Sequence, residues 1–138
     1  MLTDLLQNIL LLTDSYKISH WRQYPPGTEK VFAFFESRGG DSPTMTFFGL
    51  QAIVRQYLEG VVVTDAKIQV AKRVLAAHFG SPDIFNEAGW RYILTQHDGR
   101  LPVRICAVPE GTTVPTHHVL MTIENTDPNC AWIAEYLE

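Results

Sequence analysis

A cluster of polar and aromatic residues near the N-terminus is the part of the chain best suited to chemistry. Asp14, Tyr16 and Lys17 follow directly on the leucines at positions 10–12, and the pair Pro25-Pro26 closes the stretch. The leucines would anchor this segment inside a fold, while the tyrosine ring offers a flat face to a planar ligand. The segment therefore predicts a site for a planar ligand.

The same residues also have purely structural interpretations. Asp14 or Ser15 can cap a short helix that runs to about Gln23, before the proline pair ends it. Tyr16 can be an aromatic residue of the core or of an interface. Arg38 precedes two glycines at the end of a predicted strand, and it can be a solvated loop residue. From the residues alone, the structural and the ligand-binding interpretations both stay open.

Metal binding has little support in the sequence. His117 and His118 are adjacent, so their side chains would point apart, and no third ligand is near them in the sequence. Cys106 and Cys130 are too few and too far apart to suggest a disulfide framework or a zinc knuckle. We therefore expect no metal site and no disulfide in this chain, and a reducing, cytoplasmic setting.

Composition excludes two classes of partner. The 138 residues carry a formal net charge of −4, and the eleven basic residues are scattered along the chain. A nucleic-acid surface would normally show clustered lysine and arginine. No apolar stretch approaches the length of a membrane span. We expect one domain, or part of one, that binds neither nucleic acid nor a membrane.

Apolar patterns and capping residues predict a mixture of helices and short strands, which is the α+β class. Residues 30–37 have apolar side chains on both faces, which is typical of a buried strand. Thr64 is expected to cap a helix that ends at Gly80, and Asn86 to cap a further helix that carries Trp90. The other predictions for this part are a short strand over residues 44–48 and a helix over residues 49–59 that stops at Gly60.

The last third changes character. Residues 102–107 and 119–124 alternate as two strands would, and turns at Pro109 and at residues 115–118 are expected to join them. Asp127 and Pro128 should begin a helix, with proline at its first position. That helix would present an apolar surface and lead into a following domain or a partner chain. The residues expected on this surface are Trp132, Tyr136 and Leu137, although Trp132, like Trp90, can also be a core residue.

Nearly the whole chain resembles the N-terminal region of the nicotinamide phosphoribosyltransferase family, one of the nicotinate/nicotinamide phosphoribosyltransferases. Many short matches in the same order make the resemblance specific. The matching segments are LLTDSYK (11–17), His20, QYPP (23–26), KVFAFFESR (30–38), TFFGLQ (46–51), DIFNEAGW (83–90), DGRLPV (98–103), AVPEGTTVP (107–115) and ENTDPNC (124–130).

The resemblance implies a fold and an activity. The family builds an α+β domain with a mixed or antiparallel sheet beside an α/β barrel-like catalytic domain, and it works as a homodimer. Residues 1–138 would be the N-terminal α+β domain, with the barrel and the catalytic residues absent from this chain. The complete enzyme transfers phosphoribosyl from 5-phosphoribosyl 1-pyrophosphate to nicotinamide, giving nicotinamide mononucleotide for NAD biosynthesis. Mg²⁺ comes mainly with the pyrophosphate, and ATP is a possible further cofactor.

The same resemblance assigns three substrate-binding residues. Tyr16 would stack on the pyridine across the dimer interface. Asp14 would accept a hydrogen bond from the carboxamide, and Arg38 would bind a phosphate through two parallel hydrogen bonds. We expect the isolated chain to be inactive and to need a second subunit or a barrel-domain chain. Two alternatives remain: nicotinate as the substrate, or a non-catalytic module that binds a partner or regulates a longer homologue.

Overall fold

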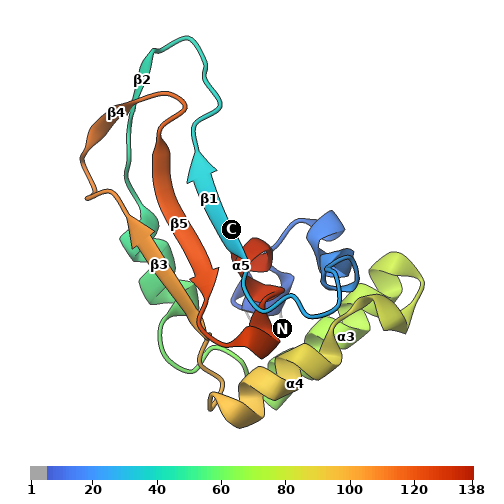
Figure 1. The fold of residues 1–138 in the computed structure, drawn as a ribbon. Coiled ribbons are helices and arrows are strands. Elements are labelled where there is room, and N and C mark those ends of the chain that lie inside the picture. The colour runs from blue at the N-terminus through green and yellow to red at the C-terminus, as the bar shows by residue number, and fades with distance from the viewer. Residues whose placement is uncertain (1–5) are drawn as a thin grey trace.

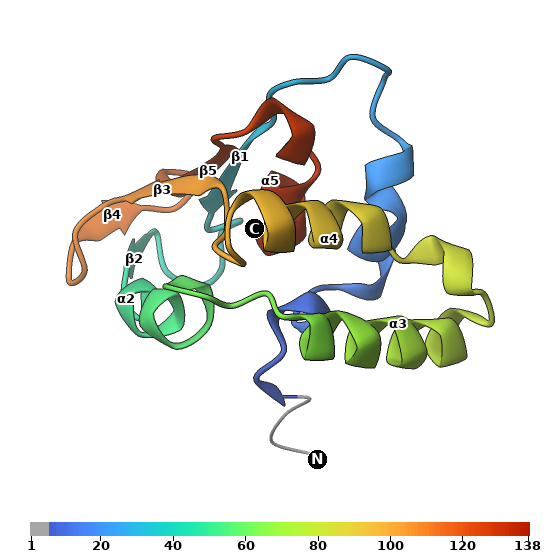
Figure 2. The same cartoon turned by 90° about the horizontal axis from the view of Figure 1, so that it is seen from below.

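The computed structural model describes residues 6–138, which form an antiparallel sheet beside a layer of helices (Figures 1 and 2). Three strands make the main sheet in the order β1 (Phe32–Glu36), β5 (Val119–Asn125), β3 (Val103–Ala107). Both neighbouring pairs are antiparallel. A second, two-stranded antiparallel sheet pairs β2 (Thr44–Thr46) with β4 (Thr113–Pro115). The predicted α+β class with an antiparallel sheet is confirmed.

Strand β1 differs from the sequence prediction in its burial. It lies at the edge of the sheet, bonded only to β5. Phe32 is 60% exposed, and Phe34 and Phe35 are also exposed. The prediction of a buried strand is therefore wrong for residues 6–138, because α5 lies beside β1 without covering its three phenylalanines. Strand β4 was not predicted either, since its partner β2 is about 70 residues away in sequence.

The long helix α3 (Asp65–Phe79) begins and ends where its capping residues predict. The Thr64 side chain accepts a hydrogen bond from the backbone N–H of Lys67, which satisfies one of the unpaired donors of the first turn. Gly80 follows in the left-handed conformation, with φ of 68°. One stripe of the helix, made by Ile68, Ala71 and Leu75, is buried.

Helix α4 (Glu87–Gln96) packs beside α3 and in front of the last helix, α5 (Ile133–Leu137), as Figure 2 shows. The Asn86 side chain caps α4 by accepting from the Gly89 N–H at 3.0 Å. The short 3₁₀ turn η5 (Pro128–Cys130) precedes α5, and the Asp127 side chain caps it. The predicted helix after Asp127 thus exists as two short pieces.

An aromatic cluster joins α4 to α5 at the centre of the core. The Trp90 ring lies 5.0 Å from the Trp132 ring and 5.2 Å from the Tyr136 ring, in edge-to-face arrangements that aromatic pairs favour. Trp132 is only 9% exposed and Tyr136 only 6%. The prediction of an apolar surface around Trp132 and Tyr136 is therefore wrong, because both rings face inward onto Trp90.

The remaining elements are short. They are the 3₁₀ helices η1 (Ile9–Leu11), η2 (Ser15–Arg22) and η4 (Pro82–Ile84), and helix α2 (Leu50–Ile53), which continues into the π-helical turn η3 (Val54–Leu58). Gly60 follows η3 with φ of 79°, as predicted. None of the apolar residues of α2 and η3 is buried. Within residues 6–138, no helix has the length and apolar character needed to cross a membrane.

Candidate functional site

Tyr16 lies in η2 and presents its ring to an open hollow. The side chain is 61% exposed, and its ring centroid is 5.3 Å from that of His20, one turn further along. We call this the Tyr16 hollow; its volume is about 370 Å³. Its walls are Tyr16, Lys17, His20, Phe32, Ala33, Phe34, Glu135 and Glu138. Two exposed phenylalanines of β1 thus stand beside the predicted ligand-stacking ring.

Acidic residues of α5 and its C-terminal end order the polar side of the Tyr16 hollow. Lys17 Nζ forms an ion pair with Glu138 Oε2 at 2.8 Å, and His20 Nδ1 lies 3.5 Å from Glu135 Oε2. The Tyr24 hydroxyl donates to Glu135 at 2.9 Å. Burial, and then this bond to Glu135, raises the pKa of Tyr24, so its hydroxyl remains a donor. The carboxylates hold η2 in place and give the hollow a fixed polar wall.

Asp14 borders a second hollow that adjoins the first. This Asp14 hollow has a volume of about 470 Å³ and shares Lys17 and Glu138 with the Tyr16 hollow. Asp14 occupies the N-cap position of η2, and its carbonyl accepts from the Lys17 N–H at 3.0 Å, but its carboxylate makes no capping bond. The side chain is exposed. The carboxylate is therefore available to a ligand.

Hydrogen bonds to α5 fix the backbone of residues 10–13, which precede Asp14 and Tyr16. The Tyr136 hydroxyl donates to the Leu10 carbonyl at 2.7 Å, and the Thr13 hydroxyl donates to the Tyr136 carbonyl at 2.9 Å. Leu10 itself is fully buried. Leu10 and the partly buried Leu11 anchor the segment as predicted, whereas Leu12 is 40% exposed. The two hydrogen bonds to Tyr136 of α5 fix where Asp14 and Tyr16 emerge.

Arg38 is separated from Asp14 and Tyr16 in the structure. It is exposed, in the turn that follows β1, whereas Tyr16 stands beside the start of that strand (Figure 1). His117 braces the turn: its backbone N–H donates to the Ser37 carbonyl at 2.9 Å, and its ring lies 3.6 Å from the point where a Gly39 side chain would begin. The structure thus brings Asp14 and Tyr16 together and leaves Arg38 at the other end of β1.

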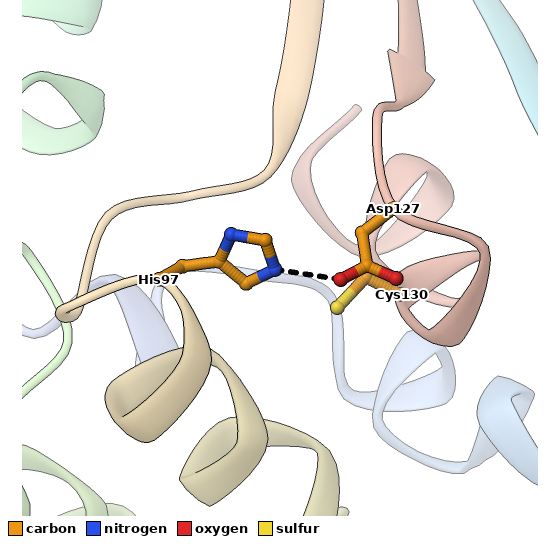
Figure 3. Close-up of side chains that lie close together, drawn as sticks. All are labelled: His97, Asp127 and Cys130. Atoms are coloured by element: carbon orange, nitrogen blue, oxygen red, sulfur yellow. Dashed lines mark hydrogen bonds and ion pairs between the residues drawn. The ribbon is translucent and has the colours of Figure 1, made fainter.

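A third group of ligand-type side chains joins α4 to η5: His97, Asp127 and Cys130 (Figure 3). His97 Nε2 lies 2.7 Å from Asp127 Oδ2, which also accepts from the Tyr92 hydroxyl at 3.0 Å. The other carboxylate oxygen accepts from the Asn129 N–H at 2.8 Å. Cys130 is fully buried, and burial, helped by the nearby Asp127 charge, raises the pKa of its thiol to about 12.

These surroundings assign the cluster a structural role. Both oxygens of Asp127 already accept hydrogen bonds, and a thiol with so high a pKa stays protonated at neutral pH. Mg²⁺ prefers oxygen ligands in octahedral arrangement, so an imidazole and a thiol do not suit it. The sequence prediction did not find this cluster, because its members are brought together by the packing of α4 against η5.

The fold and the exposed tyrosine–aspartate segment define an α+β domain with an exposed polar and aromatic edge, and the comparisons with known proteins give its family. Residues 8–105 match the family described as "Nicotinamide phosphoribosyltransferase, N-terminal domain". A nicotinamide phosphoribosyltransferase of Xanthomonas campestris pv. campestris is 57% identical over 133 residues, which are 96% of this chain and 28% of that relative. The chain belongs to the nicotinamide phosphoribosyltransferase family.

A second relative agrees. A nicotinamide phosphoribosyltransferase of Acinetobacter baylyi is 34% identical over 147 aligned residues, which cover 95% of this chain and again 28% of the relative. The chain therefore spans less than a third of the length of these relatives. These comparisons confirm the predicted family resemblance.

Proposed function

We propose that this chain supplies substrate-binding residues to an enzyme that transfers phosphoribosyl from 5-phosphoribosyl 1-pyrophosphate to nicotinamide. The observation that carries the proposal is the exposed Tyr16 ring near the exposed Asp14 carboxylate, which caps no backbone N–H of η2, in a chain of this family. The reaction forms a bond between the pyridine nitrogen and ribose C1 and breaks the bond from C1 to pyrophosphate. Catalysis of such a step is mostly positioning and neutralisation of the leaving group.

Each of the three residues has a distinct task in this proposal. Tyr16 stacks on the pyridine ring, and Asp14 accepts a hydrogen bond from the carboxamide N–H. The same carboxylate would repel the carboxylate of nicotinate, which favours nicotinamide as the substrate. Arg38 binds phosphate oxygens with its planar guanidinium.

The separation of Arg38 from Tyr16 within one chain bears on how the site is assembled. Tyr16 and Arg38 stand at opposite ends of β1. Residues outside this chain would therefore have to complete the pocket around the two substrates. A second subunit and the barrel-like domain of the complete enzyme would provide these residues. Mg²⁺ would arrive with the pyrophosphate, where it neutralises charge on the leaving group. ATP, if used, would act on residues outside this chain.

A chimeric enzyme tests the proposal. This chain would replace the matched region of the Xanthomonas relative, and formation of nicotinamide mononucleotide would be measured. Stacking on an aromatic ring contributes about 1–3 kcal/mol, so Tyr16→Ala should raise KM for nicotinamide about ten- to hundredfold. Arg38→Ala should raise KM for 5-phosphoribosyl 1-pyrophosphate by a similar factor. The matched control is Val74→Ala, an exposed apolar residue of α3 that is 39% exposed and remote from both hollows.

The outcomes separate the proposal from its alternatives. Unchanged kinetics for Tyr16→Ala in an active chimera would show that this chain is a non-catalytic module. A chimera that prefers nicotinate would replace the proposed substrate. Asp14→Asn should narrow the preference for nicotinamide over nicotinate, because it removes the repelling charge. The 138-residue chain alone should form no product.

A further inference from the structure

His20 packs against the ring of Tyr16, the proposed stacking residue. It follows Tyr16 by four residues in η2, and the two ring centroids are 5.3 Å apart at an interplanar angle of 53°. The His20 side chain is 30% exposed, so it is held closer to the fold than the Tyr16 ring. The imidazole therefore forms a support on which the exposed ring rests.

The Tyr16 ring has few other restraints within residues 6–138. The hydrogen bond that a side chain makes to Tyr16 in this part of the chain comes from Ser19, goes to the backbone carbonyl and leaves the ring free to rotate. An exposed side chain of this kind samples the staggered χ1 rotamers. Contact between aromatic rings favours one arrangement over the others. The contact with His20 therefore decides how often the ring takes the orientation seen in the structure.

Glu135 of α5 fixes the imidazole in turn. Its Oε2 atom lies 3.5 Å from His20 Nδ1, within the range of an ion pair, and the same oxygen accepts from the Tyr24 hydroxyl at 2.9 Å. Tyr24 packs against the hydrophobic core, so its hydroxyl holds the carboxylate in place. Lys17, a cation on the same wall, is already paired with Glu138 at 2.8 Å. Glu135 is therefore left to the imidazole.

We propose that Glu135 and His20 are positioning residues that hold the Tyr16 ring in the orientation in which it stacks on the substrate pyridine. The contacts run from Tyr24 through Glu135 and His20 to Tyr16, so an exposed side chain is oriented by the core. Neither positioning residue needs to touch a substrate. The inference rests on the proposed function for the task of the ring, and on the contacts alone for its orientation.

The size of the expected effect follows from the rotamers of Tyr16. A ring released from its support spreads over three staggered χ1 rotamers, so the fraction in the stacking orientation falls by up to about threefold. The apparent dissociation constant rises by the same factor, because only that fraction is competent to bind. Loss of either positioning residue should therefore weaken nicotinamide binding much less than loss of the ring itself.

Kinetics of the chimera with the Xanthomonas relative test the proposal. Glu135→Ala should raise KM for nicotinamide about threefold and leave KM for 5-phosphoribosyl 1-pyrophosphate unchanged, because Arg38 lies beyond the far end of β1. A simple loss of folded protein would instead lower kcat and leave both KM values unchanged. The matched control is Glu87→Ala, which removes two ion pairs of α4, with Lys72 and Arg91, and should change neither KM.

Two further variants separate positioning from a general structural role. Glu135→Gln keeps an acceptor for the donors of His20 and Tyr24, so it should restore most of the parent KM for nicotinamide. In a Tyr16→Ala background, Glu135→Ala should cause no further rise, because no ring remains to be positioned. The same rise of KM in both backgrounds would overturn the proposal, since the carboxylate would then act independently of Tyr16.

NMR of the 138-residue chain reads the orientation of the ring without any measurement of activity. The couplings between the Hα and Hβ protons of Tyr16 report χ1, and the Tyr16 signals are those missing from Tyr16→Phe. We expect the couplings of one rotamer in the parent and in Glu87→Ala, and averaged couplings in Glu135→Ala. His20→Ala should give the same averaging, which covers the case in which Glu135→Ala folds poorly. Averaged couplings in the parent would overturn the proposal.

The two measurements separate failure of this inference from failure of the proposed function. Averaged couplings in Glu135→Ala, with chimera kinetics that do not respond to Tyr16→Ala, would contradict the proposed function and leave the support of the ring standing. Couplings of a single rotamer in both Glu135→Ala and His20→Ala, in a protein whose KM depends on Tyr16, would overturn the positioning role and leave the proposed function standing.

Discussion

Replacing Gly89 by alanine should destabilise this protein, although a helix normally gains from that change. Gly89 lies in the first turn of α4, where alanine is favoured over glycine by at most about 1 kcal/mol. The sequence by itself would therefore predict a small stabilisation. The packing of α4 against α5 predicts the opposite.

The magnitude follows from what a new methyl group would meet. A Cβ at position 89 would lie 2.5 Å from Asn86 Nδ2 and 2.8 Å from Trp132 Cζ2, closer than carbon atoms normally approach. Overpacking of this kind costs about 1–3 kcal/mol. Displacing the Asn86 side chain would also weaken the cap of α4, at about 1 kcal/mol. After the helix-propensity gain, the net loss should be about 1–3 kcal/mol.

Urea unfolding followed by tryptophan fluorescence would measure this loss as a lower midpoint with an unchanged slope. A double-mutant cycle with Trp132→Phe isolates the contact, because phenylalanine lacks the outer ring that carries Cζ2. In that background the cost of Gly89→Ala should fall by about 1 kcal/mol. A Gly89→Ala variant that is as stable as the parent would refute the close packing of Trp132 on the first turn of α4.

Three further predictions concern Asp127, Asn125 and the two cysteines. Although burial raises the pKa of Asp127, hydrogen bonds from Asn129, His97 and Tyr92 outweigh it and hold that pKa below the usual range. Its contribution to stability is therefore present at neutral pH and lost as pH falls through and below about 4, so Asp127→Asn should flatten an acid-unfolding profile measured by circular dichroism. The buried Asn125 side chain accepts a hydrogen bond from the Val31 N–H and donates to two backbone carbonyls. Asn125→Ala should therefore lower the free energy of unfolding, measured by denaturant titration, by about 1–3 kcal/mol. Asn125→Asp, whose carboxylate has no donor, should restore little of this stability. Under native conditions a thiol reagent should modify the exposed Cys106 and not the buried Cys130, and equal rates at the two sites would contradict the fold around η5.

Local signals in the sequence predicted the helix boundaries well. Thr64 and Asn86 accept the capping bonds expected of them, and Gly80 ends α3 in the left-handed conformation. Such signals act within one turn of backbone, so a short stretch of sequence contains everything that decides them. The same holds for Asp127 at the start of η5.

Burial could not be predicted in the same way. The alternation of β1 shows apolar side chains on both faces but not that the strand lies at a sheet edge, where Phe32 and Phe34 stay exposed. The apolar residues of α5 looked equally suited to a surface or a core. Their burial depends on Trp90, about 40 residues earlier, against which Trp132 packs.

By itself, the sequence determined the family, the helix caps and the identity of three candidate binding residues, because motif and capping signals are local and keep their order along the chain. Only the tertiary structure decided how those residues are placed: Asp14 and Tyr16 on adjoining hollows beside α5, and Arg38 beyond the far end of β1. Only the structure shows that Trp132 is buried and that Phe48 and Ile53 are the exposed apolar residues. The physical reason is that burial and proximity depend on which distant segments pack together. A local pattern of side chains along the chain does not show this packing.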